Sequence, residues 1–88
     1  MNGSRVAERR VDITLSVPAY EDVDAVKKKL SAIMVSDQRT LMYRDVFVRL
    51  LESRESGLKF TTRLWTRNED YWNVYYDLVS KFKMALTE

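Results

Sequence analysis

Hydrophobic and polar residues alternate over three stretches of the chain, and a period of two is typical of half-buried β-strands. The first stretch, residues 10–17, places four apolar residues on one face: Val11, Ile13, Leu15 and Val17. The second begins near Tyr43, and the third runs from Leu58 to Trp65 after a polar turn that ends at Gly57. Because glycine can adopt a positive φ in such a turn, we expect the second and third strands to form a hairpin.

Two other stretches follow the three- and four-residue spacing of amphipathic helices. We expect the first helix to begin near Asp22, because Pro18 ends the preceding strand and Asp22 can accept hydrogen bonds from the first turn. Its predicted buried stripe is Val23, Val26, Leu30, Ile33 and Met34. The second helix is expected to start at Asn68 or Asp70, with either side chain as its cap. Its predicted stripe is Trp72, Tyr75, Tyr76, Val79, Phe82 and Leu86, and we expect it to be buried except for one of Tyr75 and Tyr76.

The order of these elements predicts an α+β fold of the ferredoxin-like type, β-α-β-β-α. We expect an antiparallel three-stranded sheet with both helices on one face and with the final strand of the complete unit missing, which would leave the first strand with an unpaired edge. The predicted domain covers residues 10–88, and residues 1–9 are interpreted as a flexible lead without periodicity. A chain of 88 residues is long enough for one domain only.

The strand alternation places a mixed apolar and cationic group on the sheet face opposite the helices. Its members are Phe47, Arg49, Leu51, Arg63 and Trp65. Exposed apolar residues rimmed by charge more often mark association with another protein surface, so these five residues are the candidate interface. RNA-recognition modules also stack bases on aromatic residues of such a sheet, which leaves an RNA-binding module as an alternative. A small-ligand regulatory domain, with its ligand held between two paired chains, is a further alternative.

Composition narrows the possible chemistry. The 15 Lys and Arg residues are nearly balanced by 13 Asp and Glu residues and are spread along the chain, so we expect no nucleic-acid partner. With no cysteine and no histidine, the chain has no thiolate metal site and lacks the commonest acid/base residue. Its two glycines cannot form a glycine-rich phosphate loop, and its acidic clusters fall where helix caps are expected. We therefore expect no enzymatic activity, no metal and no cofactor, and a chain that is soluble as given because no apolar run is long enough to cross a bilayer.

Several segments, taken in order, resemble the C-terminal cytoplasmic domain of the small-conductance mechanosensitive channel (MscS) family. The resemblance extends over nearly all of residues 9–84, and the order and spacing of the segments carry it. The segments are the strand 11–17, Asp22-Val23-Asp24-Ala25-Val26, Val46-Phe47-Val48-Arg49-Leu50, Phe60-Thr61-Thr62-Arg63-Leu64-Trp65 and Asn73-Val74-Tyr75-Tyr76-Asp77.

The resemblance implies a homo-oligomeric channel, usually a heptamer, of the bacterial inner membrane. Such channels open under bilayer tension and release solutes during osmotic stress. This domain would then be a soluble cage domain on the cytoplasmic side that contributes to subunit assembly and to the solute vestibule. Its partners would be the other subunits and its own upstream β domain. The family also has transmembrane helices upstream and an apolar strand downstream, so the chain is interpreted as a fragment of a longer protein.

Overall fold

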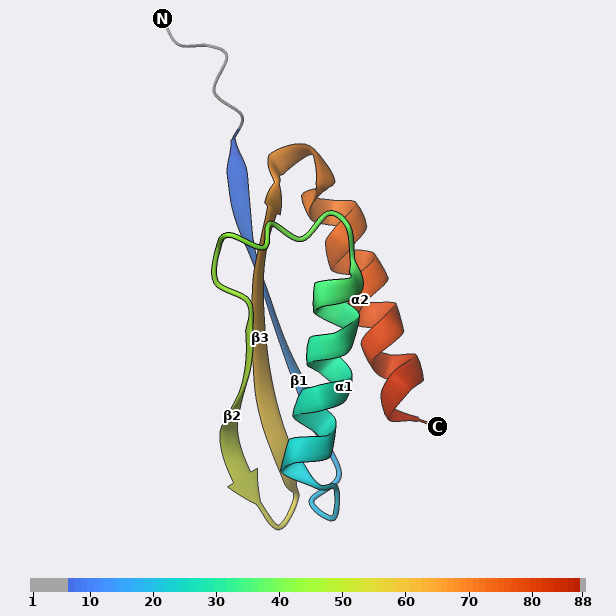
Figure 1. Ribbon diagram of the computed structural model, residues 1–88. Coiled ribbons are helices and arrows are strands. Elements are labelled where there is room, and N and C mark those ends of the chain that lie inside the picture. Colours follow the sequence, from blue (N-terminus) through green and yellow to red (C-terminus); the bar gives the residue numbers. More distant parts are fainter. Residues whose placement is uncertain (1–6, 88) are drawn as a thin grey trace, which may run out of the picture.

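The computed structural model describes residues 7–87, which form a three-stranded sheet with two α-helices on one face (Figure 1). The elements are β1 (Glu8–Val17), α1 (Val23–Ser36), β2 (Phe47–Arg54), β3 (Gly57–Arg67), the short 3-10 helix η1 (Asn68–Asp70) and α2 (Tyr71–Leu86). The strand order is β1-β3-β2, and both pairs are antiparallel. The predicted β-α-β-β-α order and α+β class are confirmed. Residues 1–6 of the predicted lead lie outside the described residues, and β1 begins two residues before the predicted boundary at Arg10.

The ends of β1 and α1 follow the expected local chemistry. β1 stops at Val17, immediately before Pro18, and Asp22 is the N-cap of α1, with its Oδ1 accepting a hydrogen bond from the Asp24 amide at 3.3 Å. The turn between β2 and β3 needs Gly57, whose φ is +153° and whose missing Cβ would lie 2.9 Å from the Val17 carbonyl oxygen. A side chain at this position would therefore displace the end of β1.

The core lies between the sheet and the two helices. β3 is the central strand, and its alternate residues are buried along nearly its whole length: Leu58, Phe60, Thr62, Leu64 and Thr66. The helices contribute Val26, Leu30 and Met34 from α1 and Val74, Leu78 and Phe82 from α2. The predicted stripe of α1 is confirmed, because Val23 and Ile33 also pack against this core. Removing these apolar groups from water is the main stabilising contribution of the fold.

The predicted stripe of α2 is wrong for Trp72 and Val79, which are 54% and 42% exposed, and it missed Val74 and Leu78, which are buried. Of the two tyrosines of which one was expected to stay exposed, Tyr76 is 61% exposed and Tyr75 packs against the core. Apolar residues occupy more than one side of this helix, and the sheet covers only one of them. The residues at every fourth position, Val74, Leu78 and Phe82, approach the sheet, and the rings of Trp72 and Tyr76 lie outside this stripe.

The start of α2 also differs from the prediction. Asp70 is its N-cap residue, yet within the described residues its side chain makes no capping hydrogen bond, and Asn68 lies inside η1. Exposed rings gather over this first turn. The Trp72 and Tyr76 rings stack with centroids 5.8 Å apart, and the Arg9 guanidinium lies 3.7 Å from the centroid of the Tyr71 ring. The entry to α2 is therefore held by η1 and by aromatic contacts with β1.

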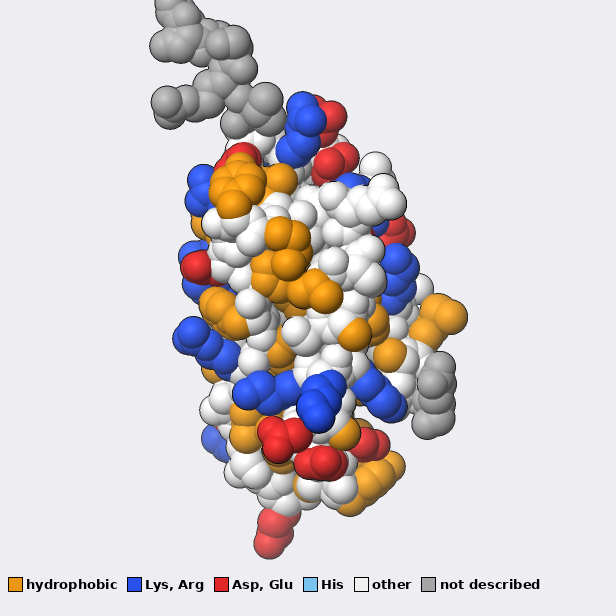
Figure 2. Space-filling model, viewed as in Figure 1, with side chains coloured by type: hydrophobic (Ala, Val, Ile, Leu, Met, Phe, Trp, Pro, Cys, Tyr) orange, Lys and Arg blue, Asp and Glu red, His pale blue; other side chains and the backbone are white. Residues whose placement is uncertain are grey.

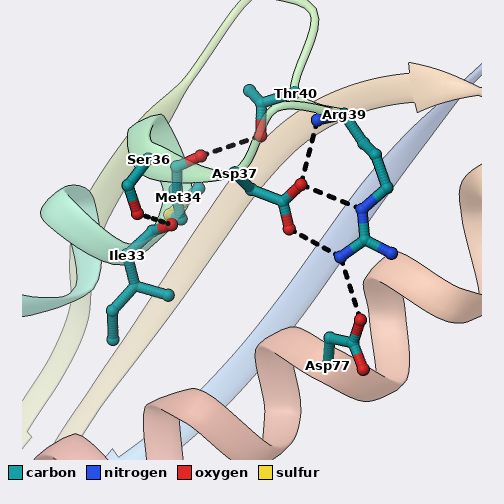
Figure 3. A network of polar contacts seen from close by, with 7 residues as sticks. All are labelled: Ile33, Met34, Ser36, Asp37, Arg39, Thr40 and Asp77. Atoms are coloured by element: carbon teal, nitrogen blue, oxygen red, sulfur yellow. Dashed lines mark hydrogen bonds and ion pairs between the residues drawn. The ribbon is translucent and has the colours of Figure 1, made fainter.

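A polar network joins the end of α1 to α2 (Figure 3). Arg39 donates hydrogen bonds to both carboxylate oxygens of the buried Asp37, at 2.9 Å from Nε and 2.8 Å from Nη2, and Nη2 also donates to Asp77 on α2 at 2.9 Å. Thr40 donates to the Met34 carbonyl at 2.8 Å. The Arg39 hydrogen bonds outweigh the effect of burial and lower the pKa of Asp37. The loop after α1 is thereby tied to the second helix.

Candidate functional site: the outer face of the sheet

Three of the five predicted interface residues meet on the sheet face opposite the helices. The strand register places Phe47 opposite Arg63. The guanidinium carbons of Arg49 and Arg63 lie 4.1 Å and 5.0 Å from the centroid of the Phe47 ring. Arg63 also donates to Asp12 on β1 at 2.9 Å, so this row of contacts crosses all three strands. The Phe47 ring is thus in contact with two guanidinium groups, and one of them is paired with a carboxylate.

Trp65 lies on the same face, two residues along β3 from Arg63, and is partly covered by a loop. The Arg44 guanidinium carbon is 4.1 Å from the centroid of a Trp65 ring. Arg44 Nε donates to Glu8 Oε1 at 2.6 Å, and the Tyr43 hydroxyl donates to Glu8 Oε2. Through these contacts, the loop before β2 covers the indole ring of Trp65 and is hydrogen-bonded to β1. The second strand was predicted to begin near Tyr43, but β2 begins at Phe47, so Tyr43 and Arg44 lie in the preceding loop. Sequence reasoning therefore missed their contacts with this surface.

The same contacts shift the pKa values of the groups around Trp65. The Tyr43 hydrogen bond, together with Arg44, lowers the pKa of Glu8. The pKa of Tyr43 is raised because its proton is held by the Glu8 carboxylate. Burial acts to raise the pKa of Asp12, but its hydrogen bonds from Arg63 and Arg10 outweigh burial, and the net shift is downward. All three groups therefore keep their ordinary charges at neutral pH, and the charges on this face are largely paired.

Leu51 departs from the predicted alternation. The β2–β3 register shifts between Leu50 and Glu52, which leaves Leu51 without a partner on β3. This residue is 54% exposed at a β-bulge. The extra residue breaks the period of two, so the sequence alternation no longer determines the face of Leu51. Its place in the candidate interface is not supported by the strand register.

The chemistry of this face suits contact more than catalysis. Within residues 7–87, no group of three or more His, Cys, Asp or Glu side chains is placed to hold a metal ion. The predicted residues instead form aromatic surfaces partly covered by guanidinium groups, an arrangement that is common at protein interfaces. Over the same residues, no helix is long and apolar enough to cross a membrane.

Charges are distributed differently over the helices. Figure 2 shows Lys and Arg side chains in a band across α1, above Asp and Glu side chains at the lower end of that helix. The α1 sequence supplies three consecutive lysines, Lys27, Lys28 and Lys29, and an aspartate in its first turn, Asp24. Aspartate near a helix N-terminus is favourable because it complements the helix dipole. A solvated charged face of this kind explains α1 without a ligand.

Comparison with known proteins decides the family. Residues 11–88 match the sequence pattern of the family described as "Mechanosensitive ion channel MscS, C-terminal". The chain belongs to the MscS family. It is 42% identical over 86 residues to the small-conductance mechanosensitive channel of Edwardsiella ictaluri (strain 93-146), a match that covers 98% of this chain and 30% of the relative. An uncharacterized MscS family protein of Buchnera aphidicola subsp. Acyrthosiphon pisum is 37% identical over 98% of this chain and 28% of its own length.

The fold of this MscS domain also agrees with a solved structure. The crystal structure of Helicobacter pylori MscS in a closed state superposes with a TM-score of 0.83 and 27% sequence identity, over 92% of this chain and 32% of that one. The predicted family and fold class are confirmed. Neither the family match nor these relatives support the alternatives of an RNA-binding or ligand-regulatory module. The chain spans about a third or less of the length of these relatives, which themselves carry the names of channels or of the MscS family.

Proposed function

We propose that this MscS domain forms part of the cytoplasmic wall of a mechanosensitive channel, where it contributes to subunit assembly and to the vestibule that solutes cross. The match of residues 11–88 to the C-terminal MscS domain carries this proposal. The relative from Edwardsiella ictaluri, which shares 42% identity with the chain, is named as a small-conductance mechanosensitive channel. The proposed role is mechanical, and no residue of the domain acts as a catalyst.

The partners in this proposal are other copies of the same channel subunit and the subunit's own β domain. A homo-oligomeric ring, a heptamer as in the family, would place the domain on the cytoplasmic side of the bacterial inner membrane. Membrane-spanning segments of the longer protein would anchor it there. The relatives are about three times as long as this chain, which is consistent with such additional parts.

The outer face of the sheet is the proposed contact surface of the wall. Phe47 and Trp65 offer aromatic area on this face, and Arg49, Arg63 and Arg44 cover it with guanidinium groups whose charges are partly paired. Aromatic residues and arginine are enriched at protein interfaces, because they combine a large contact area with directional hydrogen bonds. These contacts support an interface with a neighbouring subunit or domain.

A domain exchange tests the channel role. The C-terminal domain of the Edwardsiella ictaluri channel would be replaced by the matching residues of this chain and expressed in cells that lack their own mechanosensitive channels. We expect the hybrid to protect these cells during hypo-osmotic shock and to give tension-activated currents in membrane patches. A hybrid that reaches the membrane but neither assembles nor conducts would contradict the proposal, with the unmodified channel as the positive control.

Two tryptophan substitutions in the hybrid locate the contact surface. We expect Trp65→Ala to weaken assembly, measured as the native mass of the detergent-solubilised channel. Trp72→Ala is the matched control, because Trp72 is exposed on α2 and lies outside the proposed contact surface. If Trp72→Ala disrupted assembly and Trp65→Ala did not, the interface would lie on α2 and not on the sheet.

A further inference from the structure

The loop between α1 and β2, residues 37–46, joins the helix layer to the outer face of the sheet (Figure 1). Thr40 is buried and donates a hydrogen bond to a carbonyl of α1 at 2.8 Å. The Leu41 amide donates to the Trp65 carbonyl of β3, also at 2.8 Å. Val46, the last residue of the loop, packs against the core. Hydrogen bonds and packing therefore fix both ends of the loop.

The four residues at the tip of this loop, 42–45, are exposed. Two of their side chains reach the sheet, because the Tyr43 hydroxyl and Arg44 Nε both donate hydrogen bonds to the carboxylate of Glu8. The Arg44 guanidinium carbon also lies 4.1 Å from the centroid of a Trp65 ring. Within residues 7–87, these are the only hydrogen bonds from the tip to the sheet. One carboxylate on β1 therefore holds the tip over the indole.

The contacts that hold the tip are weaker than those at the ends of the loop. The Arg44 and Glu8 side chains are 40% and 19% exposed, and Tyr43 is 72% exposed. Exposed ion pairs contribute little to stability, because solvent screens them and because ordering long side chains costs entropy. Segments with few buried contacts are also those that open locally while the rest of a domain stays folded. We therefore expect the tip to have a closed arrangement, held by Glu8, and an open one in which Trp65 loses its cover.

We propose that Glu8 is a positioning residue for subunit assembly, because it holds the tip in the closed arrangement that a neighbouring subunit binds. This inference rests on the proposed function and extends the contact surface from the strands to the tip of the loop. In the closed arrangement, Met42 and Tyr43 are 59% and 72% exposed, so the tip presents apolar area next to the Arg44 guanidinium. Methionine, tyrosine and arginine are all enriched at protein interfaces.

Preorganisation explains how a mostly covered residue controls assembly. The Glu8 side chain is only 19% exposed, so its effect on a partner acts through Tyr43 and Arg44. Without the carboxylate, both of these side chains would move more freely and would have to be ordered when two subunits meet. Such ordering costs free energy at the moment of association, whereas a loop already held in its bound arrangement avoids this cost. We thus expect the loss of Glu8 to weaken assembly more than it weakens the fold.

Fluorescence quenching tests the closed tip in the 88-residue chain. Trp72→Phe leaves Trp65 as the only tryptophan, and its quenching by acrylamide reports how far the tip covers it. We expect Glu8→Ala to raise the quenching constant about twofold, because the loss of an exposed ion pair shifts the tip moderately toward its open arrangement. Glu8→Gln keeps one acceptor oxygen and should raise the constant less. Glu69→Ala is the matched control, because it removes a carboxylate that pairs with Arg67 at 3.6 Å, outside the tip.

The native mass of the hybrid channel tests the effect on assembly. We expect Glu8→Ala to raise the concentration at which the detergent-solubilised ring dissociates by about threefold, the cost of ordering one or two side chains at the contact. Glu69→Ala should leave this concentration unchanged. Urea unfolding of the 88-residue chain should change little for either variant, so weaker assembly would not reflect a damaged fold.

A pair of tyrosine substitutions tests whether the tip itself belongs to the contact. Tyr43→Ala in the hybrid removes the exposed ring of the tip and should weaken assembly at least as much as Glu8→Ala does. Tyr20→Ala is the matched control, because Tyr20 is 84% exposed and follows the opposite end of β1. Weaker assembly in Tyr20→Ala but not in Tyr43→Ala would overturn the proposal.

The remaining outcomes separate this inference from the proposed function. Equal quenching in the Glu8→Ala and Glu69→Ala chains would overturn the role of Glu8 in closing the tip. Increased quenching with unchanged or stronger assembly would overturn the positioning role, because the tip would then lie outside the contact or compete with it. A hybrid with the natural tip that does not assemble would contradict the proposed function, and this inference with it. Because quenching is measured in the 88-residue chain, it distinguishes a failure of the closed tip from a failure of channel assembly.

Discussion

The two faces of the sheet use the same strand in different ways. On β3, Phe60 and Leu64 point toward the helices and are fully buried, whereas Arg63 and Trp65 point to the outer face and are half-buried. The helix side is stabilised by excluding water from apolar groups. The outer side holds its aromatic rings with guanidinium contacts, which leave apolar area available to a partner. The comparison suggests that stability comes mainly from one face and association from the other.

Substitution of one phenylalanine on each face tests this division most strongly. Phe60 is fully buried at the centre of β3, and Phe60→Ala should lower the free energy of unfolding by about 3–5 kcal/mol because it leaves a cavity. Phe47→Ala on the outer face should cost about 1 kcal/mol or less, mainly from its contacts with Arg49 and Arg63. Urea unfolding followed by circular dichroism measures both changes.

Phe60→Ala, which should have the larger effect on stability, has its own control. If Phe60→Ala does not fold, Phe60→Leu keeps most of the side-chain volume and should give a measurable but smaller loss. Equal losses for Phe47→Ala and Phe60→Ala would show that the outer face contributes to stability as much as the core does, and the division between the faces would fail.

Adjacent residues on α2 make the same comparison on a helix. Leu78 is buried against the sheet and Val79 is 42% exposed. Leu78→Ala should therefore lower the free energy of unfolding by about 2–4 kcal/mol, and Val79→Ala by about 0.5 kcal/mol or less. Thermal unfolding of the two variants measures the difference. A larger loss of stability for Val79→Ala than for Leu78→Ala would instead support the buried stripe that the sequence predicted for this helix.

The sequence predicted the elements well where one period dominated. Alternation on β3 is strict, and α1 has a single apolar stripe. The sequence therefore predicted both faces of β3 and the buried side of α1 correctly. α2 has apolar residues on several sides, and their spacing alone does not determine which side meets the sheet. Residue preferences for helix caps also do not reveal that this helix is preceded by the short 3-10 helix η1 instead of starting at a side-chain cap.

The candidate surface was predictable only in part, for a similar reason. Phe47, Arg49, Arg63 and Trp65 follow strand alternation, and the structure places them on one face. Leu51 is different because a bulge inserts an extra residue, which no period reveals. Tyr43 and Arg44 reach Glu8 and Trp65 from a loop, so their contacts depend on the tertiary fold.

The hydrogen bonds of Arg39 allow a buried ion pair to be compared with an exposed one. Arg39→Gln should lower the free energy of unfolding by about 2 kcal/mol, because it leaves the buried Asp37 carboxylate without its bidentate partner. Arg54→Gln is the matched control, since the Arg54–Glu52 pair is exposed at 3.2 Å and should contribute about 0.5 kcal/mol or less.

A double substitution separates pairing from packing in this network. Adding Asp37→Asn to Arg39→Gln removes the buried charge and should recover part of the loss, as measured by urea unfolding. If Asp37→Asn added its full individual cost to that of Arg39→Gln, the two residues would not interact energetically.

Acid titration should give the smallest effect and extends the comparison to charge. Asp37 on the helix side and Asp12 on the outer face both have lowered pKa values in the folded chain. In the unfolded chain each carboxylate takes up a proton near its ordinary pKa of about 3.9, before the folded chain does. Each therefore stabilises the fold above that pH, and this stability is lost as the pH falls through the lower, folded pKa.

The two aspartates should differ in how much of the acid sensitivity they carry. Asp37 is buried beside Arg39, whereas the Asp12 side chain is 39% exposed and solvent screens its contacts with Arg10 and Arg63. Urea unfolding between pH 6 and pH 3 should therefore show a clearly flatter acid dependence for Asp37→Asn and only a slight change for Asp12→Asn. An equal change in both variants would mean that the paired charges of the outer face stabilise the isolated domain as much as the buried network does. In that case, the open face could not be explained as a surface reserved for association.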